Sequence, residues 1–98
     1  MEINQILWSP LSKSSYYNIL VYLEENWTIK ELEKFVNRTE EVLNQIHVNP
    51  LLYPFSNEGN IHKCVITKQT SLYYRIKSNS IELLVFWDNR QNPKKLRI

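Results

Sequence analysis

The sequence lacks the features that stabilise small secreted domains or anchor proteins in membranes. Cys64 is the only cysteine among the 98 residues, so no intramolecular disulfide can form. The segment MEINQILWSP has neither the basic start nor the apolar run of a signal peptide. The longest apolar stretch, IELLVFW, contains a glutamate and is far shorter than the roughly 20 residues that span a bilayer. We therefore expect a cytoplasmic protein that does not act at a membrane.

Glycine is also scarce, with one residue in the chain, whereas 43% of the residues are hydrophobic and 22% are charged. This composition predicts a single globular domain over residues 1–98, with one core. Aromatic residues should supply much of its apolar area, and we expect Trp8, Trp27 and Trp87 in the core. His62 and Cys64 are too few to form a metal site, and we predict neither a metal nor another cofactor.

Charge is unevenly distributed along the chain. Residues 1–48 carry four Lys or Arg and seven Glu, whereas residues 49–98 carry eight Lys or Arg and three Asp or Glu. The basic second half favours an anionic partner, either nucleic acid or an acidic protein segment. The alternative is a strand-rich half with Lys and Arg on its solvated surface.

Two helices are predicted in the first half. From Ser12 to Trp27, apolar residues recur at spacings of three and four, as on one helix face: Tyr16, Ile19, Leu20, Leu23 and Trp27. Thr28 and Glu31 form a capping box that starts a second helix, and Asn49 and Pro50 end it. Its apolar stripe comprises Ile29, Leu32, Phe35, Val36, Val42, Leu43 and Ile46. With almost no linker, the helices should form an antiparallel hairpin.

Three strands are predicted after the loop PLLYPFSNEGN. The segments IHKCVITKQ, SLYYRIK and IELLVFWD are β-branched, aromatic or apolar, and should form an antiparallel meander whose last strand is buried on both faces. With EINQILW as a further strand, we expect an α+β fold of order βααβββ, an antiparallel twisted sheet covered on one face by the helical hairpin. Side-chain alternation places Tyr73, Arg75 and Lys77 on the face left free.

The strand YYRI, the turn that follows it and the segment FWDNRQNPKKL resemble the RelE/ParE toxins of bacterial type II toxin–antitoxin systems. The similarity extends from Trp8 to Leu96. It implies a growth-inhibiting toxin that is neutralised by a cognate antitoxin protein encoded beside it. In the final segment, we expect Asp88 and Asn89 to turn the chain and Pro93 to prevent extension of the strand.

One activity of this family is cleavage of messenger RNA, usually on the ribosome and without a metal. Basic side chains stabilise the charge that develops at phosphorus, and another side chain moves the proton of the 2′-hydroxyl. The resemblance implies Arg75 and Arg90 as catalytic residues. Phosphate-binding cations and a candidate base complete the set: Lys63, Lys68 and Arg75, with His62 or Asp88.

The other activity is ParE-like poisoning of DNA gyrase by binding, which needs no catalytic residues. Three observations favour it. The helical hairpin of ParE toxins is relatively long, as is the segment 12–47 here. His62 and Lys63 should point to opposite faces of a strand, so both cannot line one catalytic site. The chain also ends KKLRI, without the His or Tyr that active ribonucleases tend to carry near the C-terminus. The ribonuclease is the alternative, and a degenerate or purely nucleic-acid-binding relative is a third possibility.

Binding residues are expected along the strands and the basic tail. The predicted contacts to the target or to nucleic acid are Lys63, Lys68, Arg75, Lys77, Arg90, Lys94 and Lys95. Tyr73 and Trp87 are predicted at a partner interface, because aromatic residues are common anchors. Arg75 is equally expected to have an internal partner, such as Asp88 or Glu82. We expect an acidic, amphipathic antitoxin segment to wrap the hairpin and reach the strands around Arg75.

Overall fold

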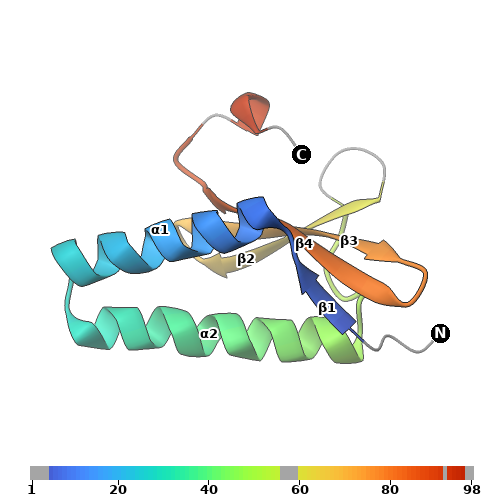
Figure 1. The fold of residues 1–98 in the computed structure, drawn as a ribbon, viewed down its shortest axis with the longest axis horizontal. Coiled ribbons are helices and arrows are strands. Elements are labelled where there is room, and N and C mark those ends of the chain that lie inside the picture. Colours follow the sequence, from blue (N-terminus) through green and yellow to red (C-terminus); the bar gives the residue numbers. More distant parts are fainter. Residues whose placement is uncertain (1–4, 56–59, 92, 97–98) are drawn as a thin grey trace.

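The computed structural model describes residues 5–55, 60–91 and 93–96, and the elements follow the predicted βααβββ order (Figure 1). The only glycine, Gly59, lies outside this part. The elements are β1 (Gln5–Trp8), α1 (Pro10–Asn26), α2 (Ile29–Val48), β2 (Ile61–Thr67), β3 (Thr70–Lys77), β4 (Ser80–Asp88) and the short 3₁₀ helix η1 (Pro93–Lys95). None of the described helices is long and apolar enough to cross a membrane.

Local capping explains where the helices begin and end. The Ser9 side chain accepts a hydrogen bond from the Ser12 N–H at 3.0 Å, and Pro10 occupies the first turn, so α1 starts two residues before the predicted Ser12. The Thr28 side chain accepts a hydrogen bond from the Glu31 N–H at 3.3 Å, as the capping box predicts. The second helix ends at Val48, which confirms the predicted end before Pro50.

The sheet has the order β1-β4-β3-β2. The antiparallel pairs β2–β3 and β3–β4 confirm the predicted meander. The prediction of a wholly antiparallel sheet is wrong, because β1 runs parallel to β4 with Gln5 opposite Ser80. A parallel pair needs a long crossover connection, which the helical hairpin and the two intervening strands supply. The last strand is therefore central, between β1 and β3.

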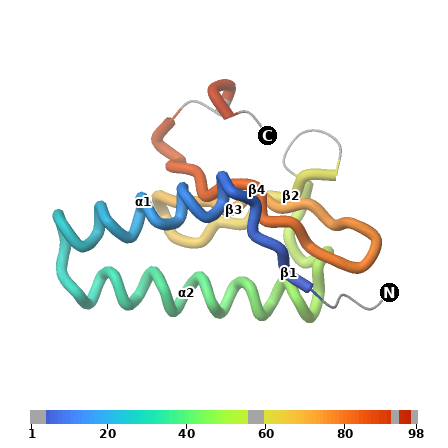
Figure 2. Tube along the Cα trace, in the orientation of Figure 1, coloured from blue at the N-terminus to red at the C-terminus, as the bar shows by residue number. Residues whose placement is uncertain are grey.

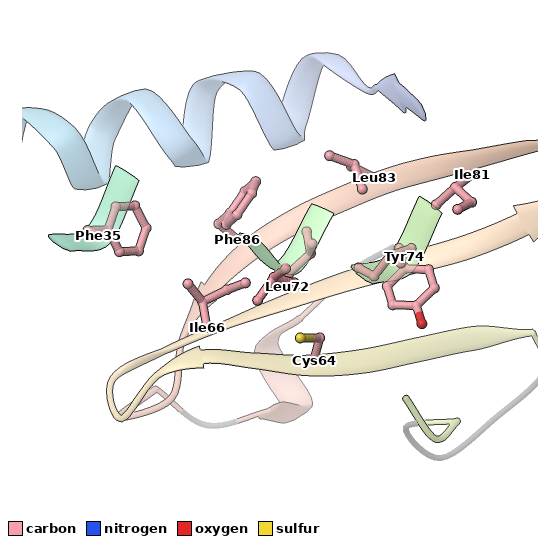
Figure 3. Packing of buried hydrophobic residues seen from close by; sticks show 10 residues of the cluster. Phe35, Cys64, Ile66, Leu72, Tyr74, Ile81, Leu83 and Phe86 are labelled. Atoms are coloured by element: carbon pink, nitrogen blue, oxygen red, sulfur yellow. The ribbon is translucent and has the colours of Figure 1, made fainter. Parts of the chain in front are cut away.

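One face of the sheet is covered by the hairpin and holds the main core (Figure 3). Phe35, Val42 and Ile46 of α2 belong to the same buried cluster as strand residues Cys64, Ile66, Leu72, Tyr74, Ile81, Leu83 and Phe86. Aromatic rings extend the cluster toward α1, where Tyr16 lies 5.0 Å from Phe86 between ring centroids. Burial of this apolar surface is the principal source of the stability of the fold.

The tip of the hairpin extends past the end of the sheet (Figure 1). As a result, Trp27 is 53% exposed and Ile29 is 63% exposed, and the predictions that both lie in the buried stripe are wrong. The first helix ends at Asn26, so Trp27 follows its last turn and lies at the tip of the hairpin. Trp8, by contrast, packs against the main core, in line with its prediction.

The second face carries a smaller cluster formed by Tyr73, Leu84 and Val85. Trp87 packs partly buried against it, and so does Leu96 from the segment after β4. This segment leaves the sheet on the side away from α2 (Figure 2). The face opposite the helices, called the open face below, is therefore not wholly free as predicted, because Leu96 covers part of it.

Candidate functional site on the open face of the sheet

Three cations lie on the open face at one end of β3. Lys63 is opposite Tyr73 in the β2–β3 register, and its Nζ lies 6.0 Å from the centre of the Tyr73 ring. Arg75 and Lys77 share one acidic partner: Arg75 Nε lies 3.3 Å and Lys77 Nζ 3.5 Å from Glu82 Oε1. The three cations and one carboxylate leave a positive excess, which favours an anionic partner.

The ion pair between Arg75 and Glu82 is close but poorly aligned. Arg75 Nε and Glu82 Oε1 are both buried, and neither has a hydrogen-bond partner of good geometry in the described part of the chain, although the two atoms lie within ion-pair distance. The Arg75 side chain remains 40% exposed. The sequence left open whether Arg75 has a partner within the protein. The structure gives it one, Glu82. Both groups retain hydrogen-bonding capacity that a ligand could use.

Arg90 lies elsewhere, just past the end of β4. Its guanidinium makes a two-pronged pair with Asp88, with Nε 3.0 Å from Oδ1 and a terminal nitrogen 2.9 Å from Oδ2. Hydrogen bonds from Arg90 hold the pKa of the Asp88 carboxyl below its ordinary value, although burial acts in the opposite direction. A carboxyl with a lowered pKa is a weak base at neutral pH.

The chain turns at the end of β4, as predicted for Asp88 and Asn89. The Asn89 N–H donates to the Gln69 carbonyl at 2.8 Å, and its side chain accepts a hydrogen bond from Ser71 Oγ at 2.8 Å. The Asn89 amide also donates to the Lys68 carbonyl at 3.4 Å. Arg90 therefore lies at the same end of the sheet as Lys68, in the β2–β3 turn.

The two predicted catalytic arginines are not brought together. Thr70 is opposite Asp88 and Arg75 is opposite Glu82, so five strand residues separate these two rungs of the ladder, which is roughly 17 Å. Arg75 groups with Lys63 and Lys77, and Arg90 groups with Lys68. Lys94 and Lys95 are exposed on η1 beyond both groups.

His62 is on the helix-covered side and is buried, with 3% of its surface exposed. Its Nδ1 lies 2.7 Å from the Tyr53 carbonyl oxygen, and its ring is stacked 5.0 Å from that of Tyr74. The neighbouring Lys63 lies on the open face, so the predicted opposite orientation of the two side chains is confirmed. His62 has the contacts of a core residue and does not face the cations.

No group of three His, Cys, Asp or Glu residues that could hold a metal ion occurs in the described ranges. Cys64 is buried in the main core, and burial raises the pKa of its thiol. Both features lower its reactivity, because the thiolate is the nucleophilic form.

The aromatic residues predicted at a partner interface lie together on the open face. Tyr73 is buried, burial raises the pKa of its hydroxyl, and Trp87 packs against its cluster. The Trp87 indole Nε1 is buried and has no hydrogen-bond partner within the described residues. Sequence reasoning missed Leu96 on this face; the only signal is one apolar residue directly after the two lysines of the tail.

Comparison with known proteins gives structural similarity only. No protein-family model matches the chain, and no curated protein sequence matches it. The toxin–antitoxin system ParDE of P. aeruginosa is similar in structure, with a TM-score of 0.72 and 12% identity, over 88% of this chain and 95% of that one. The YoeB dimer of Staphylococcus aureus is also similar, with a TM-score of 0.57 and 22% identity, over 87% and 94%.

A copper-bound mutant toxin from Helicobacter pylori has a TM-score of 0.57 and 12% identity, over 88% of this chain and 94% of that one. The similar structures thus include both ParE-type and YoeB-type proteins, and each covers most of both chains. The helical hairpin, the central last strand and the open face together give this chain the fold of the RelE/ParE toxins.

Proposed function

We propose that this protein is the toxin of a type II toxin–antitoxin pair, and that it inhibits growth by binding its target in the manner of ParE. The target implied by this likeness is DNA gyrase, and the neutralising partner is a cognate antitoxin. Similar structures described as a ParDE system and as a YoeB–YefM toxin–antitoxin complex support the pairing with an antitoxin. The higher TM-score to the ParDE structure supports the ParE-like form.

The separation of the candidate catalytic residues carries the preference for binding over catalysis. Arg75 and Arg90 lie at different ends of the sheet, and each is paired with a carboxylate. The candidate bases are unsuited, because His62 is in the core and Asp88 has a lowered pKa. General acid–base catalysis needs a base within hydrogen-bond reach of the reacting proton, next to the stabilising cations. A toxin that acts by binding needs only a surface complementary to its target and no assembled catalytic site.

A RelE-like ribonuclease is the second candidate, and one observation favours it. Lys63, Arg75 and Lys77 lie on one open face beside a buried tyrosine, an arrangement that can bind a phosphate backbone. The likeness to YoeB, at the higher identity of 22%, is compatible with this candidate.

Induction of the chain alone in bacteria separates the two candidates. For a ParE-like toxin, we expect growth to stop with DNA breaks and an SOS response, while messenger RNA stays intact over the first minutes. For a ribonuclease, messenger RNA is cut within minutes without DNA breaks. Normal growth on induction, with the folded protein present, would overturn the proposal of a toxin.

Alanine variants then test how the activity is distributed. A binding toxin should lose toxicity through several surface residues, with changes at Trp87 and on the exposed side of the hairpin as harmful as a change at Arg75. Toxicity that vanishes only in Arg75→Ala and Arg90→Ala, with circular dichroism and antitoxin binding intact, would support catalysis instead. In that case each loss should correspond to roughly 2–4 kcal/mol of transition-state stabilisation.

A further inference from the structure

The first helix carries apolar side chains on two opposite sides. Ser15 marks the side toward the sheet, because its hydroxyl accepts a hydrogen bond from the Phe86 N–H of β4 at 3.0 Å. Tyr17 follows two residues later, which is about 200° around the helix, so it lies on the side away from the sheet. Its side chain is 65% exposed. The outer side of a surface helix is normally polar, so an apolar outer side of α1 points to a contact that one chain does not make.

A hollow of about 270 Å³ lies beside Tyr17, between α1 and α2. Its lining is apolar apart from one carboxylate: Tyr17, Leu20, Val21, Leu32 and Val36, with Glu24. The four aliphatic residues are only partly buried. Single exposed apolar residues are normal on protein surfaces, but several around one concavity mark an interaction surface. The hollow is smaller than the pockets that enclose a drug-sized ligand, so side chains of a protein are better occupants.

The charged residues of α1 are placed against its helix dipole. Lys13 lies in the first turn, and Glu24 and Glu25 lie in the last turn, whereas a helix favours acidic residues at its start and basic residues at its end. The second helix has the favourable arrangement, with Glu31 in the first turn and His47 in the last. Neither Lys13 nor Glu24 belongs to an ion pair within the described residues. The charges of α1 would therefore be matched by a helix that runs beside it in the opposite direction.

The outer side of α1 is complementary to a reversed copy of itself. Lys13, Tyr17, Leu20 and Glu24 follow one another at spacings of four, three and four, and so form one ridge along the helix. The ridge reads basic, aromatic, aliphatic and acidic. In an antiparallel second copy, each Lys13 meets a Glu24 and each Tyr17 meets a Leu20, because the members of each pair lie equally far from the middle of the ridge. A parallel copy would instead place like charges together.

We infer that the outer side of α1 is the contact surface of a homodimer, in which α1 packs antiparallel against α1 of a second copy across a two-fold axis. Each Tyr17 packs against the hollow of the other copy, and two ion pairs between Lys13 and Glu24 flank the centre. A two-fold contact uses the same patch on both subunits, which this ridge satisfies. A uniformly acidic partner would be repelled by Glu24 and a uniformly basic one by Lys13, so both are poorer occupants. The inference is independent of the proposed function.

Sedimentation velocity of the purified chain tests the inference over roughly 5 to 500 μM, since a contact made by one helix is small and should be of moderate affinity. We expect monomer at the lowest concentration and dimer at the highest. Tyr17→Ala should weaken dimerisation at least about tenfold, because it removes an aromatic side chain from the contact. The matched control is Tyr22→Ala, at a 46% exposed position of the same helix outside the hollow, and it should dimerise within about twofold of wild type. Circular dichroism checks that both variants fold.

Charge reversal tests the antiparallel arrangement. Lys13→Glu places like charges face to face and should weaken dimerisation about tenfold, as should Glu24→Lys. The double variant restores opposite charges in exchanged positions and should dimerise within about threefold of wild type. Each reversal also improves the match with the helix dipole, so a loss of dimer in the single variants cannot come from a weakened helix.

The outcomes bear on the dimer alone. A wild-type chain that stays monomeric over the whole concentration range would overturn the inference, and so would a dimer that Tyr17→Ala and the single reversals leave unchanged. Single reversals that weaken the dimer without rescue in the double variant would rule out the antiparallel pairing. A monomeric wild-type chain that loses toxicity or antitoxin binding in Tyr17→Ala would assign the outer side of α1 to another protein. Induction in bacteria tests the proposed function separately.

Discussion

The two faces of the sheet differ in whether their buried polar groups have hydrogen-bond partners. On the helix-covered face, the Tyr74 hydroxyl donates to the Pro50 carbonyl at 2.8 Å and His62 is hydrogen-bonded to the Tyr53 carbonyl. On the open face, Arg75 Nε, Glu82 Oε1 and Trp87 Nε1 are buried without a well-formed hydrogen bond in the described residues. Buried polar groups are almost always paired in folded proteins. Stability is therefore concentrated on the first face, and the second retains groups suited to a partner.

The largest expected difference between the faces concerns apolar packing. Leu72→Ala removes a fully buried side chain beneath the helices and should lower the free energy of unfolding by about 2–5 kcal/mol. Val65→Ala, at a 52% exposed position on β2, should change it by less than about 0.5 kcal/mol. Denaturant titration of both variants measures the contrast. Similar losses in the two would remove the distinction between the faces.

A second pair of variants compares adjacent tyrosines on β3 that point to opposite faces. Tyr74→Phe deletes a buried hydrogen bond and leaves the Pro50 carbonyl without its partner, so we expect a loss of about 1–2 kcal/mol. Tyr73→Phe should cost less than about 0.5 kcal/mol, because its buried ring is preserved and its hydroxyl makes no hydrogen bond within the described residues. The same denaturant titration applies, and equal losses would contradict the comparison.

A substitution at Trp87, unlike the others, should not lower the free energy of unfolding. Trp87→Phe removes the indole N–H that has no partner and keeps an aromatic ring against Tyr73. The gain from removing an unpaired buried donor offsets the smaller ring, so the free energy of unfolding should stay unchanged or rise by up to about 1 kcal/mol. A clear decrease in the melting temperature would show that the indole N–H is already satisfied in the free protein.

The smallest expected effect is a pH dependence of the stability, caused by Asp88 at the end of β4. The pKa of Asp88 is lowered in the folded chain, mainly by hydrogen bonds from Arg90. The ionised carboxylate therefore stabilises the fold above the unfolded-state pKa of about 4. This stabilisation is lost as the pH falls through the folded pKa. Because the pair is largely exposed, the effect should be small. The melting temperatures of wild type and Asp88→Asn should converge as the pH falls below the folded pKa of Asp88; a gap that widens there would contradict this.

The parts of the fold that follow local rules were predictable from the sequence. Thr28, Glu31 and Pro50 fix the ends of α2 through capping and proline geometry, and the apolar run of β4 indicates a strand buried on both faces. The parallel pairing of β1 was not predictable, because it joins distant segments and leaves no local pattern. Trp27 fits the periodicity of α1 but lies after its end, where burial depends on how far the sheet extends.

For the candidate site, the alternation of side chains correctly placed Tyr73, Arg75 and Lys77 on the open face. It could not show that Arg90 lies at the far end of the sheet, since the path after β4 depends on the turn at Asn89. The packing of Leu96 is likewise a tertiary contact made by an irregular segment, which has no period to detect.

The central position of β4 makes completion of the sheet depend on the synthesis of this strand. Ser9 donates a hydrogen bond to the Leu84 carbonyl, 75 positions later in the chain, and β1 has β4 as its strand partner. A nascent chain that stops before β4 lacks the partner of both β1 and β3 and has no complete layer for the helices to cover. Such distant contacts slow folding and are made after the local ones. Synthesis must therefore have passed β4 before the surface built by β3 and β4 exists, and nascent chains that stop before β4 cannot present it.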